Sequence, residues 1–243
     1  MHEAPAYPLA RPTEIGGVWA VRHGQSTVNA ASDDPDADTR PRVPDWTIEL
    51  SPLGRQQAAT LGEWWSRLGG DRPGLVLCSP YLRTRQTWAA MEQATRGSGD
   101  DPVVVVDERL RDREMGALEL WSPAAIRRDA PEEAERRARL GDWFYRPPGG
   151  ESLADVTLRV RDLVYELERP AARTQFLIVA HDATIAALRR IFAGPGSELP
   201  DELPPVPNAS VSQWIQDGGR LKLIRWGRTG DLGVRSAPGP SGS

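Results

Sequence analysis

Short apolar runs alternate with segments of helical periodicity along most of the chain. Four such runs contain four or five residues each and predict strands, at residues 17–21, 75–78, 103–106 and 176–180. Between and after them, apolar residues recur at the spacing of one helix face, most regularly from Leu153 to Leu167. Two more apolar runs, at residues 211–215 and 221–226, flank Asp217-Gly218-Gly219 and predict a hairpin.

The order of these elements predicts the fold class. Ser51 followed by Pro52 is typical of a helix start, and the same pair of residue types precedes a helix predicted at residues 122–140. Strands separated by helices indicate a three-layer α/β/α sandwich with a mainly parallel central sheet and helices on both faces. We expect a flexible tail over residues 1–14, a single domain over 15–233 and a second flexible tail over 234–243. A long polar loop over the site is expected at residues 30–48.

Polar side chains gather where the predicted strands end. Arg22 and His23 follow the first strand, Ser79 to Arg83 follow the second, and His181 with Asp182 follow the fourth, whereas Asp112 and Glu114 come shortly after the third. In a doubly wound sheet these ends lie along one edge, where ligands bind. Arginines, neutral donors and a histidine suit a phosphate, and the imidazole adds a nucleophile.

Each of these residues, taken alone, also has a purely structural interpretation. A histidine beside an arginine is more often a surface pair or a buried structural histidine than a catalytic residue. The convergence of four segments on one crevice argues for function. Cys78 is the only cysteine, which excludes a multi-cysteine metal site, and three histidines are too few for a histidine-rich one.

Composition and charge limit the classes of molecule that this protein is expected to bind. The net charge of −4 and the pI of about 5.5 exclude a global basic field for nucleic acid. No segment approaches the roughly 20 apolar residues that span a membrane. The N-terminus lacks the features of a signal peptide, so we expect a cytoplasmic protein that does not bind membranes. Oligomeric state is left open, with a homodimer among the alternatives.

Several motifs together resemble the histidine phosphatase superfamily, which includes cofactor-dependent phosphoglycerate mutase. The matching segments are Arg22-His23-Gly24 with Asn29, Leu50-Ser51-Pro52-Leu53-Gly54 with Gln57, Ser79-Pro80 with Arg83 and Thr87, Gly149-Gly150-Glu151-Ser152, Val179-Ala180-His181, and Asn208-Ala209-Ser210. The resemblance extends roughly from Val18 to Trp226 and implies a phosphoglycerate mutase-like fold.

The resemblance also implies a mechanism. His23 attacks phosphorus and becomes phosphohistidine, which water later cleaves. Arg22, Arg83 and His181 hold the phosphoryl oxygens as charge redistributes. Ser26 and Asn29 add neutral donors. The nearby arginines are expected to lower the pKa of His23, and the mechanism requires neither a metal nor a cofactor.

The general acid is less clear, because the family usually has a glutamate four residues before a glycine. Here that position is Asp112, counted back from Gly116, and it is the first choice. Glu114 and Glu119 are the alternatives, and surface charge is the plain interpretation of this segment. Asp182, which we place with the phosphate-binding residues, is a further candidate, with helix capping as its plain interpretation.

We therefore expect a metal-independent phosphatase that hydrolyses a small phosphorylated metabolite. The second hypothesis is a phosphoglycerate-type mutase that uses the same phosphohistidine. A third is a catalytically inactive module that binds phosphorylated ligands. The substrate itself carries no motif in the sequence, since a fold does not specify one.

Overall fold

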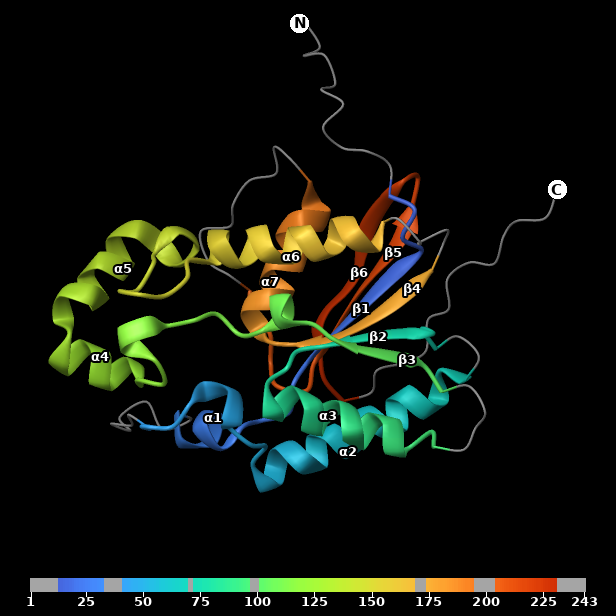
Figure 1. Cartoon of the computed structure of the whole chain (residues 1–243), viewed down its shortest axis with the longest axis horizontal. Coiled ribbons are helices and arrows are strands. Elements are labelled where there is room, and N and C mark those ends of the chain that lie inside the picture. Colours follow the sequence, from blue (N-terminus) through green and yellow to red (C-terminus); the bar gives the residue numbers. More distant parts are fainter. Residues whose placement is uncertain are drawn as a thin grey trace, which may run out of the picture.

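A six-stranded mixed sheet forms the centre of the domain (Figure 1). The computed structural model describes residues 13–32, 41–69, 72–96, 101–168, 174–194 and 204–230. The strands are β1 (Gly17–Arg22), β2 (Leu75–Cys78), β3 (Val103–Val106), β4 (Gln175–Ala180), β5 (Val211–Asp217) and β6 (Arg220–Arg228), in the order β3-β2-β4-β1-β5-β6. The first four of this order are parallel, and β5 and β6 continue the sheet in antiparallel fashion. This confirms the predicted class.

Helices cover both faces of the sheet (Figure 1). On one face, α2 (Pro52–Arg67) and α3 (Leu82–Gln93) bury a cluster that includes Trp64, Trp65 and Trp88. On the other, α6 (Leu153–Leu167) and α7 (Asp182–Ala193) bury a separate aliphatic cluster around Ile178. The sheet is thus the middle of three layers, and its central apolar strands β1, β2 and β4 are buried between the two helical layers.

The predicted helix starts are correct. Ser51 Oγ accepts the backbone N–H of Gly54, and Pro52 occupies the first turn of α2. Ser152 and Asp155 form a capping box at the start of α6. Such caps satisfy N–H groups that the first turn of a helix leaves unpaired.

The helix predicted at residues 122–140 is two helices. α4 (Pro123–Asp129) ends at Ala130, and α5 (Pro131–Phe144) begins directly after it. Pro131 forces this break, because the residue before a proline avoids the helical region, and Ala130 has φ −142° and ψ 54°. The two helices project beyond the end of the sheet where α1 (Thr27–Ser32) also lies (Figure 1).

Other boundaries differ in detail. The loop expected at residues 30–48 begins as the last turn of α1 and contains a short 3-10 helix, η1 (Asp45–Thr47); residues 33–40 lie outside the described chain. Both predicted tails fall almost wholly outside it too, at residues 1–12 and 231–243. Thr13, which the sequence assigned to the first tail, donates its backbone N–H to Gly219 and its hydroxyl to Glu168. The ordered domain therefore includes it.

The sequence pattern predicted the hairpin at one edge of the sheet but not the exposure of β3 at the other. The hairpin turn was predicted correctly, since Gly218 and Gly219 both have positive φ, which a two-residue turn between twisted strands requires. β3 is an edge strand, and its four valines are 37–64% exposed. None of the helices in the described part of the chain is both long and apolar enough to cross a membrane.

Candidate active site

His23 lies directly after β1, and the ends of the neighbouring strands hold its backbone. Its N–H donates to Ala180 at the end of β4, and its carbonyl accepts the N–H of Ala209 just before β5. Gly24 packs against the start of α2, where a Cβ would lie 2.5 Å from the carbonyl oxygen of Gly54. Only glycine fits there, because the backbone of residue 24 approaches the backbone of α2 too closely for a side chain.

The ring of His23 is set up as a nucleophile. Its Nδ1 lies 2.7 Å from the carbonyl oxygen of Gly24, which can only accept, so Nδ1 carries the proton and Nε2 keeps its lone pair. Arg83 Nε donates to that Nε2 at 3.3 Å. Burial lowers the pKa of His23 well below its usual value, and the charges of His181, Arg83 and Arg22 lower it further. The expected direction is confirmed, with burial as the main cause.

Arg83 connects the nucleophile to two acids. It lies in the first turn of α3 and is buried. Its Nη1 and Nη2 donate to Asp45 at 2.9 and 3.1 Å, and Nη2 also donates to Asp112 at 2.8 Å. The ring of Tyr81 stacks against the guanidinium, 4.8 Å from centroid to Cζ. This packing fixes the guanidinium beside His23 Nε2.

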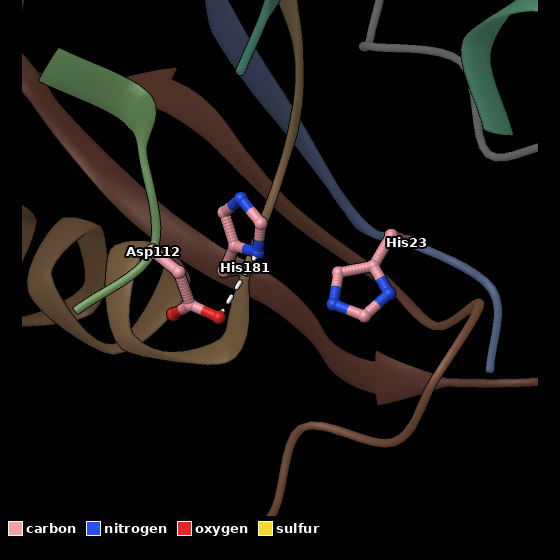
Figure 2. A group of neighbouring side chains, drawn as sticks. All are labelled: His23, Asp112 and His181. Carbon is pink, nitrogen blue, oxygen red and sulfur yellow. Dashed lines mark ion pairs between the residues drawn. The ribbon is translucent and has the colours of Figure 1, made fainter. Parts of the chain in front are cut away.

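His181 ends β4 and faces His23 across the pocket, with ring centroids 5.1 Å apart (Figure 2). Its Nε2 shares a hydrogen bond with Ser79 Oγ at 2.9 Å. Its Nδ1 lies 3.2 Å from Asp112 Oδ2, at an angle that does not suit a hydrogen bond, so this contact is electrostatic. Burial lowers the pKa of His181, although Asp112 opposes the shift.

Arg22 is a second arginine beside His23. Its Nη1 donates to the carbonyl of Val206 at 2.6 Å, and its Nη2 lies 3.2 Å from Asp182. Its Nε is buried and has no hydrogen-bond partner in the part of the chain that the structure describes. Asp182 therefore holds Arg22, and it also accepts the N–H of Ala183 in the first turn of α7.

Ser26 and Asn29 lie together at the pocket wall. Ser26 Oγ accepts the backbone N–H of Asn29, and Asn29 Oδ1 accepts the backbone N–H of Ser26. Asn208, at the last of the motifs, donates its side-chain amide to Asn29 Oδ1 and to the carbonyl of His23. The remaining hydrogen-bonding group of Asn29 is its amide NH₂, which suits an anionic ligand.

The structure separates the three candidate acids that follow β3, Asp112, Glu114 and Glu119. Asp112 contacts Arg83 and His181, and Glu119 also lines the pocket, whereas Glu114 pairs with Arg111 outside it. Although burial opposes ionisation, His181 and Arg83 hold the pKa of Asp112 well below its usual range. Burial instead raises the pKa of Glu119 to about 7. Asp112 lies closest to the reacting groups, and Glu119 is the better proton reservoir at neutral pH.

One pocket of about 500 Å³ is lined by Arg22, His23, Ser26, Asn29, Arg83, Asp112, Glu119 and Asp182. His181 is fully buried beside His23 and is not among the residues that line this pocket. The predicted strand ends therefore converge. The pocket also includes residues that sequence reasoning missed, among them Asp45, Arg113 and Arg137. Asp45 lies in η1, between segments without a recognisable motif. The one sequence signal for Asp45 was its position in the loop at residues 30–48, which was expected to lie over the site.

The donor atoms of His23, Asp112 and His181 lie within 4.8 Å of one another, which is close enough to bind a metal ion (Figure 2). The surrounding charge argues against that use. Arg83 Nε occupies the lone pair of His23 Nε2, and Arg22 adds a second guanidinium to the same pocket. Two permanent cations disfavour a divalent cation and favour an oxyanion.

Asp112→Asn is expected to lower turnover roughly 10²- to 10⁴-fold, because it removes the acid that contacts both His181 and Arg83. Glu119→Gln, the matched change in the same pocket, is expected to cost less than about tenfold. Steady-state kinetics from pH 5 to 9 test both. If Glu119 donates the proton, kcat/KM of the unchanged enzyme falls as pH rises through about 7, and Glu119→Gln is the more damaging change. Equal, small losses would remove Asp112 from the chemistry.

Comparison with known proteins agrees with this geometry. A model of the histidine phosphatase superfamily (branch 1) matches residues 18–229. The chain is 33% identical over 225 residues to the glucosyl-3-phosphoglycerate phosphatase of Mycobacterium tuberculosis, covering 85% of this chain and 89% of the relative. It is 31% identical over 179 residues to 2,3-bisphosphoglycerate-dependent phosphoglycerate mutase 2 of Gloeobacter violaceus, covering 69% and 71%. The solved structure of the mycobacterial glucosyl-3-phosphoglycerate phosphatase with VO3 superimposes with a TM-score of 0.68 at 30% identity, over 86% of this chain and 98% of the other.

Proposed function

The chain belongs to branch 1 of the histidine phosphatase superfamily, and on that premise we propose that it hydrolyses a small phosphomonoester through a phosphohistidine on His23. The observation that carries the proposal is the lone pair of His23 Nε2, which accepts a hydrogen bond from Arg83 Nε at 3.3 Å in a pocket that Arg22 also lines, with the ring of His181 5.1 Å from the ring of His23. An inactive binding module is disfavoured, because no member of this group is missing.

The reaction has two steps. In the first, the lone pair of His23 Nε2 forms a bond to phosphorus while the bond from phosphorus to the ester oxygen breaks. The leaving oxygen takes a proton from Asp112, whose pKa rises when the substrate phosphate engages Arg83 in its place, or from Glu119 if that residue is the acid. In the second step, water attacks phosphorus, the same acid takes its proton, and His23 is released with inorganic phosphate.

Electrostatic stabilisation comes from groups already in place. The guanidinium groups of Arg83 and Arg22 line the pocket beside His23, where preorganised charge lowers the barrier to phosphoryl transfer most. Asp45 presently binds both terminal nitrogens of Arg83. Burial raises the pKa of Asp45, so its carboxylate is a poor competitor for Arg83 once a phosphate dianion arrives. We therefore expect the substrate phosphate to displace Asp45.

The first candidate substrate is glucosyl-3-phosphoglycerate or a related phosphorylated glyceric acid derivative. The support is the 33% identity to the mycobacterial phosphatase, across 85% of this chain. A pocket of about 500 Å³ with charged walls also suits a compact polar molecule better than a lipid phosphate.

Hydrolysis is favoured over mutase transfer. A mutase must exclude water and hold a second phosphate. The adjacent arginines Arg127 and Arg128 are exposed on α4, and neither lines the pocket. Of the two relatives compared above, the phosphatase has higher sequence identity and coverage than the mutase.

Phosphate release from a panel of phosphomonoesters, without added metal, tests the proposal. The panel contains glucosyl-3-phosphoglycerate, 3-phosphoglycerate, glucose 6-phosphate and adenosine monophosphate. We expect the highest kcat/KM for glucosyl-3-phosphoglycerate. A different best substrate would replace that assignment, whereas release from none, together with conversion of 3-phosphoglycerate to 2-phosphoglycerate, would make the protein a mutase.

A further inference from the structure

We propose that Asp45 competes with phosphate for Arg83, and that it thereby lowers the affinity of the pocket for inorganic phosphate and limits inhibition by the product. The inference rests on the proposed function and concerns the regulation of that same site. Asp45 belongs to none of the sequence motifs that carry the family resemblance. It lines the pocket with Arg83, although residues 42–44, 46 and 47 on either side of it are exposed.

Every N–H group of Arg83 is already donated. A guanidinium has five such groups. Nε donates to His23 Nε2 at 3.3 Å, and one N–H of Nη2 donates to Asp112 at 2.8 Å. The other three donate to Asp45: Nη1 to its backbone carbonyl and to Oδ1, both at 2.9 Å, and Nη2 to Oδ2 at 3.1 Å. A phosphoryl oxygen can therefore bind Arg83 only where an acceptor leaves, and departure of Asp45 frees more donors than departure of any other.

Asp45 is also the acceptor with the least other support. In the described part of the chain, the hydrogen bonds that join residues 44–48 to other segments all come from Arg83. The remaining hydrogen bonds of residues 44–48 lie within their own turn. Asp112, by contrast, also accepts the backbone N–H of Arg113 at 2.8 Å. A ligand that replaces Asp45 thus disrupts the contacts of one short and mostly exposed turn.

The charges around Arg83 make this exchange reversible. Burial raises the pKa of Asp45, Arg83 opposes the shift, and the charge of Asp112 adds to it. A phosphate dianion carries more charge than this carboxylate and offers more acceptor oxygens to the same guanidinium. When no phosphate is bound, Asp45 returns, because a buried guanidinium without acceptors is unfavourable. Phosphate must therefore break the contact between Asp45 and Arg83 each time it binds, which weakens its apparent affinity.

Isothermal titration of the full chain with inorganic phosphate measures this competition without turnover. The variants are Asp45→Asn, which removes the charge with little change of shape, and Asp45→Ala, which removes the carboxyl group altogether. Glu49→Gln is the matched control, because Glu49 is exposed four residues further along the same segment and does not line the pocket. A crystal structure of the unmodified protein with phosphate adds the distance between the Asp45 carboxylate and Arg83.

We expect Asp45→Asn and Asp45→Ala to bind phosphate about tenfold more tightly than the parent, and to be inhibited by phosphate at correspondingly lower concentrations. Glu49→Gln is expected to stay within about twofold of the parent, because an exposed charge is screened. In the phosphate complex, Asp45 is expected to lie beyond hydrogen-bonding distance of Arg83.

Unchanged or weaker phosphate binding in both Asp45 variants would overturn the competition and would mean that Asp45 only positions Arg83. An equal gain in Glu49→Gln would overturn it too, as would an Asp45 carboxylate still bonded to Arg83 in the phosphate complex. Phosphate release from esters by the unmodified protein is measured separately. Release with no gain in phosphate affinity contradicts this inference alone, whereas neither release nor phosphate binding contradicts the proposed function as well.

Discussion

His23→Ala is expected to reduce phosphate release by roughly 10⁴-fold or more, the largest effect of any single change in this chain. The variant removes the imidazole whose Nε2 lone pair attacks phosphorus and which accepts a hydrogen bond from Arg83 before the substrate binds. Covalent catalysis is then impossible, and only direct attack by water on a bound ester is left. Residual activity therefore measures what the surrounding cations achieve without the nucleophile.

Initial rates on the best panel substrate provide this measurement, and circular dichroism provides the control for folding. His23→Gln serves as a second variant, since it keeps a polar side chain in the buried position without an imidazole. Both are expected to fold and to lack activity. A residual rate within about tenfold of the parent in either variant would show that His23 does not carry the reaction.

Arg83→Gln is expected to reduce kcat about 10³-fold or more, because removal of an arginine that stabilises phosphoryl transfer typically costs this much. The change removes the donor to His23 Nε2 and also leaves Asp45 and Asp112 facing one another without their shared cation. Two carboxylates in that position repel, so a loss of thermal stability is expected as well.

Arg85→Gln is the matched control on the same helix, since Arg85 is exposed and does not line the pocket. It is expected to retain parent activity. Arg83→Lys separates geometry from charge: an ammonium group cannot reach His23, Asp45 and Asp112 together, so we expect no substantial rescue. Full activity in Arg83→Lys would mean that positive charge alone, rather than the fork of hydrogen bonds, is what the site requires.

The sequence was sufficient to predict where the catalytic groups meet. Arg22, His23, Arg83 and His181 each follow a predicted strand, and parallel strands end on the same edge of a sheet, so the convergence required no distances. The caps at Ser51 and Ser152 were predictable for a similar reason, because capping depends on a few adjacent residues.

Contacts between distant segments could not be predicted in this way. Asp45 reaches Arg83 from a loop with no periodicity, and Arg137 lines the pocket from α5, which Pro131 separates from α4. Gly24 packs against the backbone of Gly54, which lies far from it in the sequence. In each case the deciding contact lies in tertiary packing, which local sequence does not encode.

The pKa values of the acidic residues in the pocket could not be predicted from the sequence either. Spacing from Gly116 favoured Asp112, and the structure places that residue between His181 and Arg83. Spacing did not predict that Glu119, seven residues later, lies in the same pocket with a pKa raised to about 7. Burial sets that value, and burial is known only once the fold is.

Detection of the phosphoenzyme tests the central claim most directly. The protein is mixed with a ³²P-labelled substrate, quenched in alkali within milliseconds to preserve a phosphorus–nitrogen bond, and digested with trypsin. We predict an alkali-stable, acid-labile label on the peptide of residues 23–42, which contains His23, formed at least as fast as steady-state turnover and absent from His23→Ala. Label on the peptide of residues 174–189, which contains His181, would show that His181 rather than His23 is the nucleophile. Turnover with no label on the protein at any time would contradict a covalent mechanism.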